Sequence, residues 1–213
     1  MRDIVVLGGG GHARVLIGIL KRDQQWTILG YTDNHDRGRI LGVEYLGEDS
    51  ALAGVIASHR GCNALVGVGH VTTTLIRKRL MEYGRDLGFV FPPVVSIHAI
   101  VGEAVSSGEG TVIMDGALIN TGSTLGRCCI VNSHSTVEHD CTVGDHVHIC
   151  PGAVLSGGVS VGNDVLIGAG SCIVHGVNIC DKSVIGAGSV VVGDIAEPGV
   201  YAGNPARRTG RGS

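Results

Sequence analysis

From Ala99 to Asp194 the sequence reads AIVGEA VSSGEG TVIMDG ALINTG STLGRC CIVNSH STVEHD CTVGDH VHICPG AVLSGG VSVGND VLIGAG SCIVHG VNICDK SVIGAG SVVVGD. These sixteen consecutive hexads contain no insertion, and the third position is Val, Ile or Leu in fifteen of them, with Ser107 as the exception. A strand alternates with a period of two and a helix with a period of about 3.6, so neither alone sustains a period of six. The pattern predicts short strands joined by tight corners, so that each hexad forms one flat side of a coil.

The coils are predicted to stack around one continuous apolar core. One aliphatic side chain in each hexad points inward, and the third column places Val143, Leu155, Val161, Ile167 and Ile185 there. Gly and Asn are expected at the corners, where the backbone is strained. A repeat identifies an architecture rather than a chemistry, so a purely structural solenoid remains an alternative at this point.

The composition favours a cytoplasmic enzyme. The 213 residues include 36 Gly and only 3% aromatic residues, which suits a solenoid with many corners, and the formal charge of -3 offers no basic field for nucleic acid. The start Met1-Arg2-Asp3 is unlike a signal peptide, and no apolar run reaches membrane-spanning length. The seven cysteines are expected to be reduced thiols, and six of them act as small apolar residues within the repeats.

Residues 1–95 are predicted to form a separate domain, followed by the repeat domain of residues 96–213. Apolar runs indicate buried strands near residues 4–7, 27–31 and 64–68, and helical patterns follow near residues 15–20 and 74–83. Strands that alternate with helices predict a small parallel βαβαβ sheet of the Rossmann-like α/β class.

A glycine-rich turn follows the first predicted strand. Gly8, Gly10 and Ala13 fit the G-x-G-x-x-G/A pattern, and Asp33 follows about twenty residues later. Backbone N–H groups at such a helix start favour a phosphate, with the acidic residue near a ribose hydroxyl. The turn favours a nucleotide diphosphate over NAD, because the domain holds only half of a dinucleotide-binding sheet. A turn that merely packs the strand against the helix is the alternative.

The two parts together resemble the bacterial sugar acetyltransferases. A short βαβ domain that begins GGGGHA is joined to uninterrupted hexads, and the stretch from Val200 to Ala206 carries a closing Gly-x-Pro-Ala element. This family includes N-acetyltransferases of nucleotide-linked 4-amino sugars and O-acetyltransferases of sialic acid. The resemblance implies a left-handed parallel β-helix, acetyl-CoA as the donor, a nucleotide-linked amino sugar as the acceptor, and a homotrimer. It leaves N- and O-acetylation open.

Acyl transfer to an amine or hydroxyl needs a base and a donor for the tetrahedral oxyanion. The segment Glu138-His139-Asp140 departs from the repeat consensus by clustering charge at a corner, where an adjacent carboxylate can orient an imidazole. The resemblance implies that His139 is the base and Asp140 its partner, and that His148 hydrogen-bonds the acetyl carbonyl. From the residues alone, a solvated charged corner is an equal alternative. The alternation of His146, His148 and Cys150 lacks a fourth ligand, so no metal is predicted.

The resemblance also implies two sets of binding residues. The nucleotide-sugar is expected at the glycine turn and at the ends of the second and third strands, through Gly10, Gly11, His12, Asp33, Asn34 and Gly69. Coenzyme A is expected in a groove between two helices of the trimer, with Gly157 beside the thioester and Ala169 and Ala187 further along the same face. His70, Arg77, Arg207 and Arg208 are left open as ligand contacts or ordinary surface residues.

Overall fold

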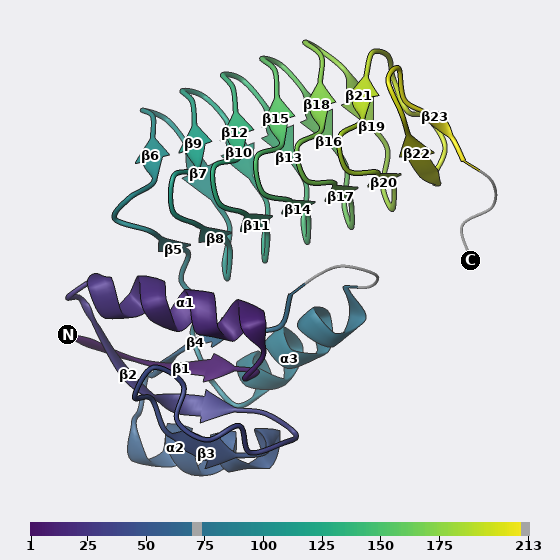
Figure 1. The fold of residues 1–213 in the computed structure, drawn as a ribbon. Helices are drawn as coiled ribbons and strands as arrows, with labels where there is room; N and C mark the ends of the chain where they lie inside the picture. Colours follow the sequence, from purple (N-terminus) through teal and green to yellow (C-terminus); the bar gives the residue numbers. More distant parts are fainter. Residues whose placement is uncertain (70–73, 210–213) are drawn as a thin grey trace. The chain divides into compact units, whose positions relative to one another are not determined.

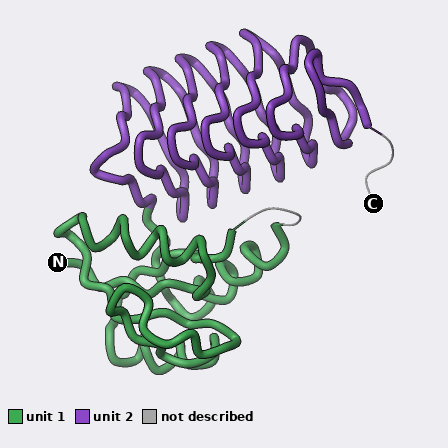
Figure 2. The backbone as a smooth tube through the Cα atoms, viewed as in Figure 1, with its two compact units in different colours: residues 1–92 green, residues 93–213 purple. Residues whose placement is uncertain are grey.

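The computed structural model describes residues 1–69 and 74–209, and the chain divides into two compact units, residues 1–92 and 93–213 (Figure 2). The division lies three residues before the predicted boundary at 95. Unit 2 includes Val94–Val95 because this strand pairs with Val112–Ile113 of the repeat. No helix within the described ranges is both long enough and apolar enough to cross a bilayer.

Unit 1 is a parallel α/β domain, as predicted. Its described residues form one sheet with the strand order β3-β2-β1-β4, and each pair of neighbouring strands is parallel. The elements are β1 (Arg2–Leu7), α1 (Gly11–Arg22), β2 (Trp26–Thr32), β3 (Tyr45–Gly47), a 3-10 turn (Asp49–Ala51), α2 (Leu52–Ser58), β4 (Asn63–Val66) and α3 (Leu75–Asp86). The sequence analysis did not predict β3 or α2, whose apolar runs are too short to show a period.

Unit 2 is a β-helix, which confirms the interpretation of the hexads. The described strands form three sheets, of five, six and eight strands (Figure 1). The strands are β5 (Val94–Val95), β6 (Ile100–Val101), β7 (Ser106–Ser107), β8 (Val112–Ile113), β9 (Leu118–Ile119), β10 (Thr124–Leu125), β11 (Ile130–Val131), β12 (Thr136–Val137), β13 (Thr142–Val143), β14 (His148–Ile149), β15 (Val154–Leu155), β16 (Ser160–Val161), β17 (Leu166–Ile167), β18 (Cys172–Ile173), β19 (Asn178–Ile179), β20 (Val184–Ile185), β21 (Val190–Val191), β22 (Val200–Ala202) and β23 (Arg207–Arg208).

The register of the coils follows directly from the repeat. Each coil contains three hexads, so residues 18 apart pair in parallel, as Thr124 does with Thr142 and Thr142 with Ser160. At the C-terminal end β22 pairs with β20, and β23 then adds to β22 in the antiparallel direction. Any residue in one coil therefore has a neighbour 18 positions away in the next coil, and this rule places the functional side chains described below.

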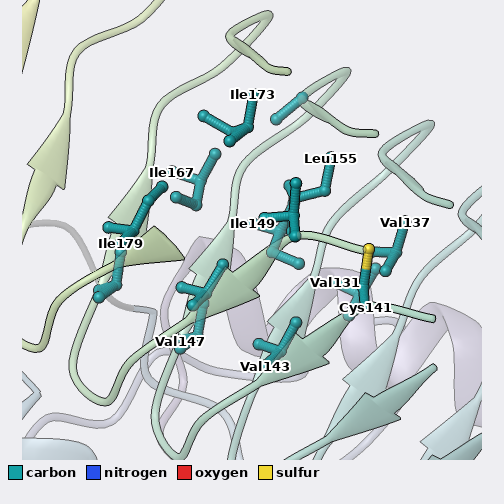
Figure 3. Close-up of a cluster of buried hydrophobic side chains, with 14 of the residues drawn as sticks. Val131, Val137, Cys141, Val143, Val147, Ile149, Leu155, Ile167, Ile173 and Ile179 are labelled. Carbon is teal, nitrogen blue, oxygen red and sulfur yellow. The ribbon is translucent and has the colours of Figure 1, made fainter. Parts of the chain in front are cut away.

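The aliphatic third column forms the core of unit 2. Leu155, Ile167 and Ile185 have no exposed surface, and Val143 and Val161 are 3% and 4% exposed. Figure 3 shows the side chains of successive coils stacked against one another inside the helix. Burial of one such side chain stabilises the fold by about 1.5–3 kcal/mol relative to leaving it in water. The predicted inward column is confirmed.

The corners use a single backbone conformation. The sixth residue of the hexad has a positive φ in fifteen of the sixteen hexads of residues 99–194, and in eight of these it is Gly. The expectation that Asn supplies the others is wrong. Within residues 99–194 the remaining seven are Ala104, Cys128, His134, Asp140, His146, Asp164 and Lys182. Residues with a Cβ are strained in this conformation, so these corners carry a cost that Gly would avoid.

Candidate active site

Three edges of the β-helix, where one sheet turns into the next, carry different chemistry. The fifth position of the hexad lies on these edges and repeats every 18 residues. We name them by their residues. The histidine edge joins the six- and five-stranded sheets and holds His139, Gly157 and His175. The aspartate edge joins the five- and eight-stranded sheets and holds Arg127, Asp145, Asn163 and Asp181, and the alanine edge holds Ser133, Pro151, Ala169 and Ala187.

His139 and Asp140 form a hydrogen-bonded pair on the histidine edge. They lie between β12 and β13, and His139 Nδ1 is 2.8 Å from Asp140 Oδ2. A carboxylate only accepts hydrogen bonds, so Nδ1 carries the proton of this bond and Nε2 keeps its lone pair. The two side chains are 55% and 73% exposed. The pair is therefore an accessible base with its tautomer set by the carboxylate.

Glycines on both sides shape the space around this pair. A Cβ on Gly157 would lie 2.5 Å from His139 Nε2, and a Cβ on Gly122 would lie 2.7 Å from Asp140 Oδ1. The backbone of the next coil is tied to the base, because Gly158 N–H donates to the His139 carbonyl at 2.9 Å. The predicted proximity of Gly157 to His139 agrees with this geometry. Gly122 was not predicted, although its position 18 residues before Asp140 marks it as the neighbour in the preceding coil.

Glu138, the third charged residue of this segment, has a structural partner. Its Oε2 accepts a hydrogen bond of 3.0 Å from Asn120 Nδ2 in the preceding coil. Its backbone carbonyl accepts the hydroxyl of the buried Ser123 at 2.8 Å. Glu138 therefore stabilises the corner that presents His139, and the base itself is oriented by Asp140.

His148 lies on a different face of the same chain. It belongs to β14 in the eight-stranded sheet, it is 8% exposed, and its Nε2 is 3.0 Å from Asn132 Nδ2. Its separation of nine residues from His139 is half a coil, which places the two histidines on different sides of the prism. Within one chain, the geometry does not bring His148 to the side chain of His139.

The predicted coenzyme residues are divided in the same way. Gly157 lies on the histidine edge, whereas Ala169 and Ala187 are exposed on the alanine edge, one side of the prism away. They stack on each other in successive coils, with Gly188 N–H donating to the Ala169 carbonyl at 2.8 Å. The expectation that all three residues follow one face of a single chain is therefore wrong, because twelve residues separate Gly157 from Ala169 and a full coil needs 18.

The aspartate edge is occupied by its own hydrogen bonds. Asp145 Oδ1 accepts the Arg127 N–H at 2.8 Å, Asn163 Oδ1 accepts the Asp145 N–H at 2.8 Å, and Asp181 Oδ1 accepts the Asn163 N–H at 2.7 Å. Partial burial raises the pKa of Asp145, but the hydrogen bonds and charge of Arg127 outweigh burial and lower it overall. These side chains cap the backbone of the next coil, so this edge serves stability.

In unit 1, the glycine turn leads from β1 into α1. Gly8 has a φ of 112°, and a Cβ there would lie 2.9 Å from Val68 Cγ2, so both conformation and space require glycine. Cβ atoms on Gly10 and Gly11 would meet nothing within 4 Å. Gly10 is the N-cap of α1 and makes no side-chain cap, and the first turn has no acidic residue. The start of α1 therefore offers open N–H groups of the kind that bind phosphate.

Asp33 holds this turn in place. Its Oδ2 accepts the Gly9 N–H at 2.8 Å, and its Oδ1 accepts the His35 N–H at 3.0 Å. Asp33 and Asn34 also line a hollow of about 90 Å³ with Gly8 and Asp49. The carboxylate therefore orders the loop that the sequence analysis assigned to the phosphate, in addition to any contact with a ribose.

The remaining predicted residues of unit 1 are partly brought together. A Cβ on Gly69 would lie 3.7 Å from His12 Cβ, so the end of β4 meets the start of α1. His70 lies outside the described residues. Arg77 is 1% exposed, and its Nη1 donates to the Val68 carbonyl, so the alternative of a solvated helix face is wrong for this residue.

The C-terminal arginines have partners within unit 2. Arg208 Nη1 is 2.7 Å from Glu197 Oε2, and Arg207 Nη1 donates to the Ala206 carbonyl at 2.9 Å. Within residues 1–69 and 74–209, no three His, Cys, Asp or Glu side chains are grouped so that they could hold a metal ion.

Comparisons with known proteins agree with both units. The family model of the PglD N-terminal domain matches residues 3–83, and the hexapeptide repeat of succinyl-transferase matches residues 158–192. GDP-perosamine N-acetyltransferase from Escherichia coli O157:H7 is 35% identical over 60 residues, which are 28% of this chain and 27% of that protein. The alignment thus spans about a quarter of this curated relative.

Two solved structures match over almost the whole chain. The acetyltransferase domain of PglB from Neisseria gonorrhoeae is 32% identical with a TM-score of 0.91, and the match covers 98% of this chain and 100% of that one. PerB from Caulobacter crescentus, solved in complex with CoA and GDP-perosamine, is 34% identical with a TM-score of 0.89, over 99% and 98% of the two chains. With both units matched in one continuous alignment, the chain belongs to the PglD-like family of hexapeptide-repeat acetyltransferases.

Proposed function

We propose that this chain transfers the acetyl group of acetyl-CoA to the amino group of a nucleotide-linked sugar, in the synthesis of surface glycans or glycoprotein sugars. The observation that carries the proposal is the His139–Asp140 pair, whose Nε2 is accessible beside Gly157. A structural solenoid has no use for an exposed, oriented base between two glycines. The resemblance to PerB, solved with CoA and GDP-perosamine, favours an amine as the acceptor.

In the proposed reaction His139 acts as a general base. Its Nε2 accepts a proton from the sugar amine as the amine nitrogen attacks the thioester carbonyl. The tetrahedral intermediate then collapses, the carbon–sulfur bond breaks, and the thiolate of CoA takes up the proton from the imidazolium. Asp140 keeps the imidazole in the reactive tautomer and stabilises its positive charge. No covalent intermediate on the enzyme is required.

Unit 1 is proposed to hold the nucleotide. The open N–H groups at Gly10 and Gly11 suit the diphosphate, and His12 and Gly69 lie beside each other next to this turn. Asp33 and Asn34 line the neighbouring hollow at the end of β2. A diphosphate at the start of α1 would carry the attached sugar, and the base would come from unit 2.

A homotrimer follows from the two edges. If Gly157 and the pair Ala169 and Ala187 contact the same coenzyme, they must come from different copies of the chain, because they lie on different edges of one prism. A ring of three prisms brings the histidine edge of each copy to the alanine edge of the next. This arrangement makes three equivalent sites.

A substrate panel tests the proposal. Purified protein is mixed with acetyl-CoA and with UDP- or GDP-linked 4-amino sugars, and free thiol and the mass of the product are measured. We expect thiol release with at least one nucleotide-linked amino sugar and a product heavier by one acetyl group. A sialic-acid-like sugar in the same panel identifies O-acetylation, and the absence of thiol release with every acceptor would overturn the proposal.

A further inference from the structure

His175 occupies the same edge as His139, two coils further on. The separation of 36 residues is two complete coils, so both histidines are at the fifth position of their hexads. Adjacent strands are about 4.7–4.9 Å apart, which would place equivalent atoms of these coils about 9–10 Å apart. The ring centroids are only 6.5 Å apart, with an interplanar angle of 45°. The two rings therefore lean toward each other across the coil between them.

The residue between them leaves this space open. The coil between the two histidines presents Gly157, whose added Cβ would lie 2.5 Å from His139 Nε2 and 2.7 Å from His139 Cε1. A Cβ on the next residue, Gly158, would lie 3.7 Å from His175 Cε1. Both imidazoles thus border the Gly157–Gly158 corner from opposite sides. Because Asp140 occupies Nδ1 of His139, the reactive Nε2 belongs to this gap.

We infer that His175 donates a hydrogen bond to the carbonyl oxygen of the acetyl thioester and stabilises the oxyanion formed there. This inference rests on the proposed function, and it assigns to His175 the role that the resemblance gave to His148. The amine must meet the thioester carbon within reach of His139 Nε2, so the carbonyl oxygen is bound beside the same corner. Within the chain, the described imidazole on the other side of that corner is His175, whereas His148 contacts Asn132 in another sheet.

Kinetics of four variants test this role. Removal of one oxyanion donor lowers kcat by about 10²–10³-fold, so His175→Ala and His175→Phe should both show that loss, with the KM of each substrate nearly unchanged. His175→Gln retains an N–H donor and should recover part of the rate. His98→Ala removes an exposed histidine of unit 2 outside the edge and should retain full kcat. A role in packing alone would leave His175→Phe active, and that result would overturn the inference.

A second measurement does not require the sugar. Acetyl-CoA labelled with carbon-13 at the carbonyl is bound to the protein, and the carbonyl resonance is followed by NMR. A hydrogen bond to the oxygen moves the resonance downfield, so we expect a downfield shift in the unmodified protein and in His175→Gln, and a smaller one in His175→Ala. An equal shift in His175→Ala, or a loss of the shift in His148→Ala instead, would overturn the inference. A normal shift without thiol release in the substrate panel would contradict the proposed acceptor alone.

Discussion

At the scale of single residues, the base is the feature most directly open to test. General-base catalysis contributes about 10²–10⁴-fold to the rate, so His139→Ala should lower kcat by that factor while both substrates still bind. Asp140→Asn should cost less, because it weakens the orientation of the imidazole without removing it. Steady-state thiol release checks both. A His139→Ala protein with nearly normal kcat would exclude this residue as the base.

Asp140 carries a conformational cost that its proposed role explains. Its φ of 59° belongs to the left-handed region, as does the φ of 58° at the exposed Lys182, and Gly occupies eight equivalent corners. Relief of this strain by Gly should stabilise the protein by about 0.5–1 kcal/mol after the entropy of the unfolded glycine is deducted. Asp140→Gly and Lys182→Gly should therefore both raise Tm, and only Asp140→Gly should lower kcat. Equal kcat in the two variants would remove Asp140 from the mechanism.

The residues of the site were predictable to the extent that they interrupt the repeat. His139 and Asp140 stand out because charge replaces the small residues of the consensus, and Gly157 follows at one coil. His175 could have been found from its spacing of 36 residues, but spacing alone does not show that two side chains lean together. That contact depends on the glycine between them and on rotamers, which the sequence pattern does not encode.

At the scale of elements, the corners of the aspartate edge make stability depend on pH. The pKa of Asp145 in the folded protein is below its ordinary value of 3.8, so its contribution is fully present above that pH and is lost as the pH falls through the folded pKa. Asp145→Asn keeps an oxygen for the Arg127 N–H but loses the ion pair, and should cost about 0.2–1 kcal/mol near neutral pH. Urea unfolding at pH 7 and pH 3 should show the difference between variant and parent shrinking at the lower pH. A constant difference would assign the effect to the hydrogen bond alone.

The glycine turn allows a substitution that separates binding from folding. A Cβ on Gly11 meets open space, whereas Gly8 has neither the conformation nor the room for one. Gly11→Val should therefore fold normally and raise the KM of the nucleotide-sugar, because the branched side chain occupies the space proposed for the diphosphate. The affinity for acetyl-CoA, measured by calorimetry, should not change. If the KM of the sugar substrate stays the same, the nucleotide binds elsewhere.

At the scale of the whole molecule, the period of six predicted the β-helix, its core column and its coil length. The periodic part is predictable because each coil repeats the same local physics. Unit 1 was predicted less completely, since β3 has only three residues and α2 only seven. The grouping of Ala169 and Ala187 with Gly157 failed for a geometric reason: positions that are alike in the hexad fall on three different edges of the prism.

This geometry makes a specific prediction about assembly. If each site combines the histidine edge of one copy with the alanine edge of the next, light scattering should give the mass of a trimer, and two inactive variants should complement each other. His139→Ala removes the base from one edge, and Ala187→Trp fills the other. After the two proteins are unfolded together and refolded as a mixture, random assembly leaves both edges intact at about a quarter of the sites. Activity near a quarter of the parent's supports the shared site, with each variant refolded alone as the control. A monomer that retains activity, or a mixture with no recovered activity, would place the whole coenzyme site within one chain.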